Sequence, residues 1–108
     1  MPQAPRKAVT VGTMTAPLPL NVQHRPEASR FEVDLGGAVG LCAYSRQGGT
    51  LLLTHTEVPA ALQGRGIAAA LVQAALAHAR AQGWRVRPSC SYVRSYMRRH
   101  PETQDMLE

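Results

Sequence analysis

The sequence predicts an α+β domain, and three features of its pattern support this class. Three apolar segments suited to β-strands follow one another between residues 30 and 58, separated by the glycine pairs Gly36-Gly37 and Gly48-Gly49. A long alanine-rich segment with helical spacing comes next. A short strand-like segment and a second helical segment complete the chain. This order predicts an antiparallel meander, then a β-α-β unit, then a closing helix.

The first three strands are expected at residues 30–35, 38–46 and 50–58. In the first of them, Phe31, Val33 and Leu35 alternate with polar residues, which is typical of a strand with one buried face. The third, TLLLTHTEV, is apolar enough to lie at the centre of a sheet. The glycine pairs between them predict tight antiparallel turns.

The helical pattern runs from Gly66 to Gln82, and its many alanines favour a helix that packs close to a sheet. Gly83 is the expected C-terminal stop. The segment WRVRP, residues 84–88, predicts a fourth strand that runs parallel to the third through a right-handed crossover. Residues 91–100 predict the closing helix, with one further turn after it.

The chain is expected to hold one small domain after an N-terminal tail. Residues 1–28 contain five of the eight prolines and show little periodicity, which predicts a flexible tail. Residues 29–108 then form a minimal domain. The sequence has no apolar run long enough for a membrane span and no signal-peptide pattern, so we expect a cytoplasmic protein that does not enter the membrane.

The net charge of +5 suits a phosphate-bearing partner, since all but one of the 12 basic residues are arginine. A basic surface without a specific partner explains this charge equally well. With one Phe, one Trp and three Tyr, the chain has few aromatic rings for base stacking, which argues against nucleic acid. Cys42 and Cys90 make neither a disulfide framework nor a four-ligand zinc site, so no metal is expected.

The segment QGRGIA, residues 63–68, lies where the third strand leads into the long helix. The first N–H groups of a helix are unpaired, and Gly66 lets them approach an anion closely. Arg65 can add a charge-assisted bond at the rim. These properties meet the requirements of a pyrophosphate site, although a glycine-rich turn with an exposed arginine is the alternative. The lysine of a Walker-type loop is missing, which argues against nucleoside-triphosphate hydrolysis.

The pattern Gln63-x-x-Gly66-x-Ala68, after a strand and before an amphipathic helix, resembles the acetyl-CoA loop of the Gcn5-related N-acetyltransferases. The segments LTHTEVPAALQGRGIAAALV and VRPSCSYVRSYMRRHPE are similar to the miniature, single-domain members of that superfamily. The resemblance covers residues 30–106 and implies the acyl-CoA N-acyltransferase-like fold. One departure is His100-Pro101, where the family usually has Gly-Phe.

The resemblance implies acetyl-CoA as the cofactor. Its pantetheine arm would lie where the third strand splays from the fourth, bonded to the backbone from Thr56 to Val58. Splayed strands leave unpaired amide groups, which an amide-rich ligand would complete. The pyrophosphate would lie on the backbone of the glycine loop, formed by Gln63, Gly64, Arg65, Gly66, Ile67 and Ala68.

The family pattern implies Tyr96 as the acid that protonates the departing thiolate, and Tyr92, one turn earlier, is a substitute. An aromatic ring packed between helix and sheet is the alternative for Tyr96. Cys90 stands near a helix N-terminus with Arg87 and Arg94 close in sequence, which predicts a lowered thiol pKa. Cys90 would then accept the acetyl group or donate a proton. A small buried residue is its alternative.

His55 lies on the third strand and is a candidate general base. The alternation of the strand groups it with Leu51 and Leu53, so a packed histidine is an equally good interpretation. Glu57 shares the same predicted face and would orient His55 or act as the base itself. We read Cys42 as a core residue, because its neighbours in the strand are apolar.

The resulting expectation is an acetyl-CoA-dependent N-acetyltransferase that acts on an exposed amine of a protein or small molecule. The alternative is a non-catalytic acyl-CoA-binding or sensing module. Gly36-Gly37 joins two strands directly where larger family members have helices, so the acceptor side is open to a partner or a second copy. We expect a monomer or a weak homodimer.

Overall fold

The computed structural model describes residues 20–108 of the chain and confirms the predicted α+β class. Within these residues, one sheet contains the strands β1 (Val22–Arg25), β2 (Arg30–Asp34), β3 (Val39–Gln47), β4 (Thr50–Glu57) and β5 (Arg85–Pro88). The α-helices are α1 (Ile67–Gln82) and α2 (Ser91–Arg99). Short 3-10 helices occupy Pro26–Ala28, Ala60–Leu62 and Pro101–Met106.

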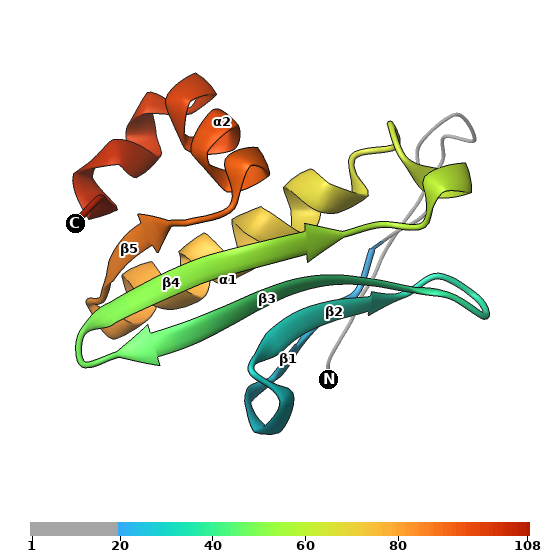
Figure 1. The fold of residues 1–108 in the computed structure, drawn as a ribbon, viewed down its shortest axis with the longest axis horizontal. Helices are drawn as coiled ribbons and strands as arrows, with labels where there is room; N and C mark the ends of the chain where they lie inside the picture. The colour runs from blue at the N-terminus through green and yellow to red at the C-terminus, as the bar shows by residue number, and fades with distance from the viewer. Residues whose placement is uncertain (1–19) are drawn as a thin grey trace, which may run out of the picture.

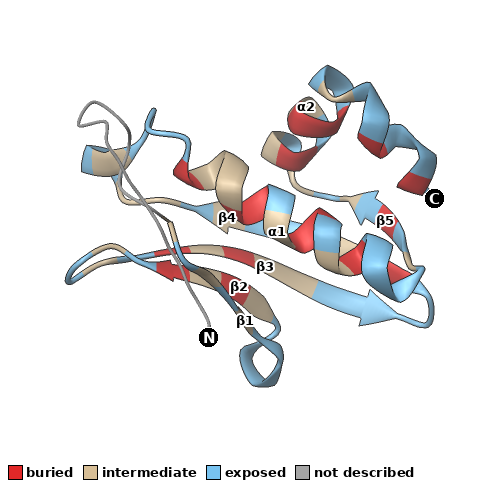
Figure 2. Cartoon of the chain, turned by 180° about the vertical axis from the view of Figure 1, so that it is seen from behind, coloured by how far each residue is buried: buried red, intermediate tan, exposed pale blue. Residues whose placement is uncertain are grey.

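The strands lie side by side in sequence order. β1 to β4 pair antiparallel, and β5 pairs parallel with β4, as the crossover through α1 predicted. α1 covers one face of the sheet, and α2 lies beside it over β5 (Figure 1). Seen from behind, α1 lies in front of the strands (Figure 2). The other face of the sheet, turned to the viewer in Figure 1, has no α-helix over it in residues 20–108. Within the same residues, no helix has both the length and the hydropathy needed to cross a bilayer.

The core lies between α1 and the covered face of the sheet. α1 buries one face, formed by Ile67, Leu71, Val72, Ala75, Leu76 and Ala79. Gly40 on β3 makes a close approach possible, because a Cβ there would lie 3.2 Å from Val33 and 3.3 Å from Ile67. Gly40 and the alanines of α1 together let the helix lie close to the sheet near the N-terminal end of α1.

The first strand corrects the predicted tail. Residues 1–19 lie outside the described part, but residues 22–25 form β1, which the prediction assigned to the tail. β1 has no strongly apolar pattern, because only one of its two inward residues, Val22, is aliphatic and the other is His24. The ring of His24 stacks on Phe31 at 4.3 Å, and its Nε2 lies 2.6 Å from the Tyr44 hydroxyl. A histidine that packs as an aromatic residue gives no alternation that the sequence alone reveals.

The segment after α2 is fastened to α1. Arg80 donates two hydrogen bonds of 2.9 Å to the carboxylate of Asp105 and one of 3.0 Å to the Glu102 carbonyl. α2 itself buries Val93, Tyr96 and Met97 in the core. These contacts fix the far end of α2, and the hydrogen bond from the Cys90 N–H to the Leu53 carbonyl holds its start beside β4.

One irregularity in β4 changes which residues face the core. Ala43 pairs with His55 and the next residue, Tyr44, pairs with Leu53, so Thr54 is an extra residue in β4. Such a bulge reverses the alternation beyond it. The prediction that His55 shares a face with Leu51 and Leu53 is therefore wrong, and Thr56 takes the inward position.

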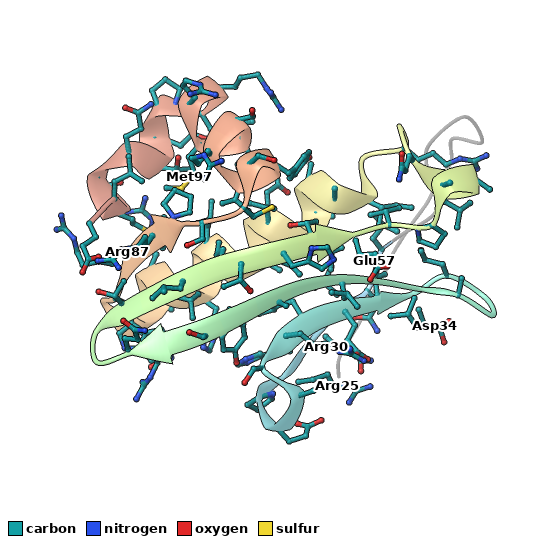
Figure 3. All side chains as sticks on the ribbon, in the orientation of Figure 1. Arg25, Arg30, Asp34, Glu57, Arg87 and Met97 are labelled. Carbon is teal, nitrogen blue, oxygen red and sulfur yellow. The ribbon has the colours of Figure 1, made fainter. Side chains whose placement is uncertain are left out.

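The uncovered face of the sheet is polar in its β1–β2 part. The carboxylate of Glu32 accepts hydrogen bonds from Arg25 at 3.3 Å and from Arg30 at 2.6 Å, and Figure 3 shows both arginines on these strands. These interactions lower the pKa of Glu32, with the Arg30 hydrogen bond as the largest cause. Glu57 is the last residue of β4 and is labelled at the end of that strand in the same view.

Candidate functional site

The site begins where β4 and β5 separate. Their parallel pairing ends at Leu53 and Pro88, whereas β4 continues to Glu57. The Cys90 N–H donates to the Leu53 carbonyl at 3.0 Å and closes the paired region. Beyond it the predicted gap is present, because no strand of residues 20–108 borders the last residues of β4 on that side. Backbone groups along such an edge are available to a ligand.

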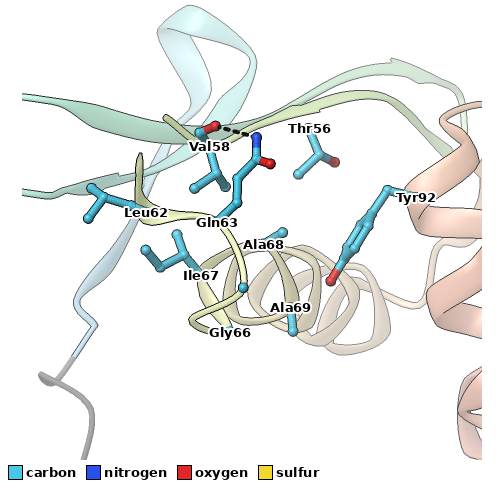
Figure 4. Close-up of a pocket in the computed structure, with 10 residues that line it drawn as sticks. Thr56, Val58, Leu62, Gln63, Gly66, Ile67, Ala68, Ala69 and Tyr92 are labelled. Atoms are coloured by element: carbon cyan, nitrogen blue, oxygen red, sulfur yellow. Dashed lines mark hydrogen bonds between the residues drawn. The ribbon is translucent and has the colours of Figure 1, made fainter. Parts of the chain in front are cut away.

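A pocket of about 420 Å³ opens at this gap (Figure 4). Its walls come from the end of β4, the loop before α1, the first turn of α1 and the start of α2. The residues are Thr56, Val58, Leu62, Gln63, Gly64, Gly66, Ile67, Ala68, Ala69 and Tyr92. Most of the predicted cofactor residues are thus brought together around one cavity.

The floor of this pocket is the N-terminus of α1. Gly66 precedes the helix with φ of 80°, and Gly64 has φ of 82°, both in the left-handed region that favours glycine. Within the described chain, no side chain caps this end of α1. The first amide groups of the helix therefore keep their positive potential for an anion.

The loop between β4 and α1 is braced across the pocket mouth. The side-chain amide of Gln63 donates a 3.1 Å hydrogen bond to the Val58 carbonyl, drawn as a dashed line in Figure 4. Arg65, which we predicted to bind the cofactor, lies on the exposed outside of the loop and not in the pocket wall. The prediction for Arg65 rested on its charge and on its position between the two glycines, and neither fixes the direction of its side chain.

Two cysteines meet at Thr56 on the inner side of the site. Cys90 caps α2, and its Sγ lies 3.7 Å from the Thr56 hydroxyl. The same hydroxyl lies 3.9 Å from Sγ of Cys42, the residue that pairs with Thr56 across β3 and β4. Cys42 is fully buried, as predicted for a core residue, whereas Cys90 is partly exposed.

The two thiols differ in acidity. Desolvation by burial raises the pKa of Cys42 to about 11, against a smaller opposing effect of its hydrogen bond with Thr56. Desolvation also acts upward on the pKa of Cys90, but backbone N–H groups of Val93 and Tyr92 and the Thr56 hydroxyl together outweigh it. The pKa of Cys90 is therefore lowered, in the direction expected at a helix N-terminus.

Of the two tyrosines of α2, Tyr92 lines the pocket and Tyr96 does not. Tyr96 is only 3% exposed, and its ring stacks on His100 at 3.9 Å. Desolvation by burial raises the pKa of Tyr92, with Arg99 acting in the opposite direction. The packed-ring alternative thus describes Tyr96, and the pocket position falls to the tyrosine one turn earlier.

The predicted base candidates lie on the other side of β4. The side chains of His55 and Glu57 are 63% and 64% exposed, with His55 Nε2 3.9 Å from a Glu57 oxygen. The bulge at Thr54 turns both toward the face that α1 leaves uncovered. They share a face, as predicted, but they are solvated residues and neither lines the pocket.

Three pocket residues were absent from the predicted cofactor set: Leu62, Ala69 and Tyr92. Leu62 belongs to a 3-10 helix that the sequence of the loop does not predict. Ala69 follows from the first turn of α1 once the helix start is known. Tyr92 has a sequence signal, because it stands two residues after Cys90 at the start of a helix.

Comparison with known proteins gives the same fold and family. A family model described as GCN5-related N-acetyl-transferase matches residues 30–106. The chain belongs to the GCN5-related N-acetyltransferase family. Protein NATD1 of Homo sapiens is 33% identical over 100 residues, which cover 90% of this chain and 88% of that protein. Protein NATD1 of Xenopus tropicalis is 35% identical over 89 residues, covering 79% and 81%.

A solved member has the fold of this GCN5-related acetyltransferase. The NMR solution structure of a GCN5-like protein from Staphylococcus aureus superimposes with a TM-score of 0.66 and covers 82% of this chain and 88% of its own. The two sequences are 23% identical, so this likeness concerns the fold. The expected acyl-CoA N-acyltransferase-like architecture is confirmed.

Proposed function

We propose that this acetyltransferase uses acetyl-CoA to acetylate an exposed amine of a protein or small molecule. The observation that carries the proposal is a single pocket joining two kinds of free backbone: the uncapped start of α1 and the unpaired end of β4. The start of α1 suits a pyrophosphate, and the end of β4 suits an extended chain with amide groups. Coenzyme A contains both groups.

The chain's own residues fit this cofactor. The backbone from Gln63 to Ala68 would hold the pyrophosphate, because Gly64 and Gly66 have no Cβ and the space beside them is open. The edge of β4 from Thr56 to Val58 would bond the pantetheine arm. Gln63 holds the Val58 carbonyl at 3.1 Å and keeps this edge oriented. When bound, acetyl-CoA supplies the activated acetyl group.

Two residues at the start of α2 are our candidates for the chemistry. Tyr92, not Tyr96, lines the pocket, so we assign to its hydroxyl the proton that the departing thiolate needs. Cys90 has a lowered pKa and is partly exposed, so it is the candidate for a covalent route in which its sulfur takes the acetyl group and passes it to the amine. Direct attack by the amine is the simpler route.

His55 and Glu57 would serve as base only for an acceptor that approaches from the uncovered face of the sheet. Their exposure and their 3.9 Å separation allow either residue to take a proton from an amine there. The described chain joins β2 and β3 through the short turn 35–38, which leaves this face open to a large acceptor. A protein surface fits an open face better than an enclosed site does.

Thermal unfolding with acetyl-CoA tests the binding part. A hundredfold excess over the dissociation constant stabilises the protein by about 2.7 kcal/mol, or roughly 10–20 °C in a domain of this size. Gly66→Glu is expected to abolish the shift, because it places a side chain and a negative charge at the anion site. Gly48→Glu is the matched control, since Gly48 also has positive φ and open surroundings but lies in the β3–β4 turn. No shift in the wild type at millimolar acetyl-CoA contradicts the proposal.

The openness of the acceptor side also favours a second function, a non-catalytic acyl-CoA-binding module. Release of free coenzyme A thiol during incubation with panels of amines and basic peptides separates the two. Amine-dependent release at a rate above the uncatalysed one supports the transferase. A thermal shift without any such release supports the binding module.

A further inference from the structure

Thr56 is the contact between two thiols that come from different elements. Its hydroxyl lies 3.7 Å from Sγ of Cys90, at the cap of α2, and 3.9 Å from Sγ of Cys42, inside β3. The Cys90 S–H donates to the Thr56 oxygen, and the Thr56 O–H donates to the Cys42 sulfur. The three groups form one chain from the pocket wall into the core.

We propose that Thr56 is a positioning residue that makes Cys90 nucleophilic, with Cys42 as the fixed donor behind it. The inference rests on the proposed function in so far as Cys90 belongs to that site. Its measurable property is the reactivity of one sulfur atom, which requires no cofactor.

The chain of hydrogen bonds can reverse when Cys90 ionises. The Cys90 proton leaves to solvent, since this residue is partly exposed. The Thr56 hydroxyl then turns and donates to the Cys90 thiolate. Its oxygen, which no longer accepts a hydrogen bond from Cys90, accepts one from the Cys42 S–H instead. A hydroxyl that donates to a thiolate stabilises the charged form.

Cys42 is suited to the donor role because it keeps its proton. It is 0% exposed, and burial raises its pKa to about 11, so at neutral pH it is a thiol. Its position is set by the pairing of β3 with β4, directly opposite Thr56. This buried thiol is more than a space-filling residue, because its contact with the Thr56 hydroxyl leads on to the sulfur of Cys90.

Other titratable groups around Cys90 do not replace this contact. Tyr92 follows it on α2, and burial raises the pKa of that phenol. Arg94, one turn along α2, donates to the carbonyls of Pro88 at 3.2 Å and Ser89 at 2.9 Å. His55 and Glu57 lie on the other face of β4, beyond the bulge.

The bulge at Thr54 is what brings Thr56 to this position. Without the extra residue, His55 would follow Leu51 and Leu53 on the inner face, and Thr56 would point outward. The irregular strand therefore gives the inner face a small hydroxyl in place of an imidazole. This hydroxyl can reach both sulfur atoms.

The test is the pH profile of Cys90 alkylation by iodoacetamide in the full-length protein, followed by intact mass. The buried Cys42 is expected to stay unmodified in the folded protein. Thr56→Val keeps the shape and removes the hydroxyl, so the midpoint should move to higher pH and the rate at pH 7 should fall at least about tenfold. Thr56→Ser should restore most of the rate, and Cys42→Ala should lower it by a smaller factor.

Thr54→Val is the matched control, because Thr54 carries the same hydroxyl on the same strand but is exposed and contacts the Ala43 carbonyl. It should keep the wild-type profile. An unchanged profile in Thr56→Val overturns the proposal, and so does an equal shift in Thr54→Val, which would assign the effect to the bulge. If Thr56→Val does not fold, unchanged rates in Thr56→Ser together with a lowered rate in Cys42→Ala support it, and an unchanged rate in Cys42→Ala overturns it. The assay contains no acetyl-CoA, so its result is independent of whether the chain binds that cofactor.

Discussion

Two tyrosines of α2 differ in their surroundings, since one lines the pocket and the other is packed inside the protein. Tyr92 and Tyr96 stand one turn apart and share a face, yet only Tyr92 reaches the pocket. Tyr96 is buried against α1 and the segment after α2, with its ring on His100. The family pattern points to Tyr96, whereas the tyrosine that lines the cavity is Tyr92, which is why we propose Tyr92 as the acid.

Exchanging each tyrosine for phenylalanine tests this division. We expect Tyr92→Phe to lower the acetyl-transfer rate by about 100-fold, the lower range for removing a general acid. The stabilisation by acetyl-CoA should change little, because the ring remains in the pocket wall. Tyr96→Phe is the control and should keep the rate within about twofold. Equal losses in the two variants would contradict the assignment of the proton to Tyr92.

At the level of elements, β1 is held to the domain by a histidine. His24 packs among rings from β2, β3 and α1, with Phe31 at 4.3 Å and His78 at 4.5 Å between ring centroids. Desolvation by burial is the largest cause that lowers the pKa of His24, and the charge of His78 acts in the same direction. Protonation of His24 therefore opposes the packing of this edge strand.

The stability of the protein should depend on pH through this residue. Because the folded pKa is below the unfolded one, the unfolded chain takes up a proton that the folded chain does not. The free energy of unfolding should then fall as pH drops through about 6.5 and should level off below the folded pKa. Urea unfolding between pH 7.5 and 5 measures this slope, above the range where the carboxylates titrate.

His24→Phe should flatten that slope, since it removes the ring whose pKa is lowered in the folded chain and leaves its neighbour His78 in place. Tyr44→Phe is the comparison, because it removes the hydrogen-bond partner at 2.6 Å and leaves the histidine in place. We expect it to lower stability at every pH and to keep the slope. A slope of wild-type size in His24→Phe would show that another group causes the pH dependence.

For the whole molecule, the order and type of the main elements followed from the sequence. Alternation predicted β2, the apolar segments that follow it predicted β3 and β4, alanine-rich helical spacing predicted α1, and glycine pairs predicted the turns. The glycine loop before α1 predicted where backbone amides would be free. These features are local, because they depend on residues a few positions apart, and local patterns can be read along a chain.

Contacts between distant residues decided the rest. β1 was missed because one of its two inward residues is His24, whose aromatic partners come from other strands. That Tyr92 lines the pocket depends on how the start of α2 is held at β4, where the Cys90 N–H donates to the Leu53 carbonyl. Neither contact leaves a periodic signal in its own segment.

The sequence by itself determined the α+β class, the meander with its crossover helix and the location of the glycine loop before α1. Only the tertiary structure decided which face of β4 carries which side chain. A single extra residue at Thr54 turns His55 and Glu57 outward and Thr56 toward Cys42 and Cys90. The pairing of two strands sets such a bulge, and because side chains alternate with a period of two, one unpaired residue exchanges the faces of all that follow.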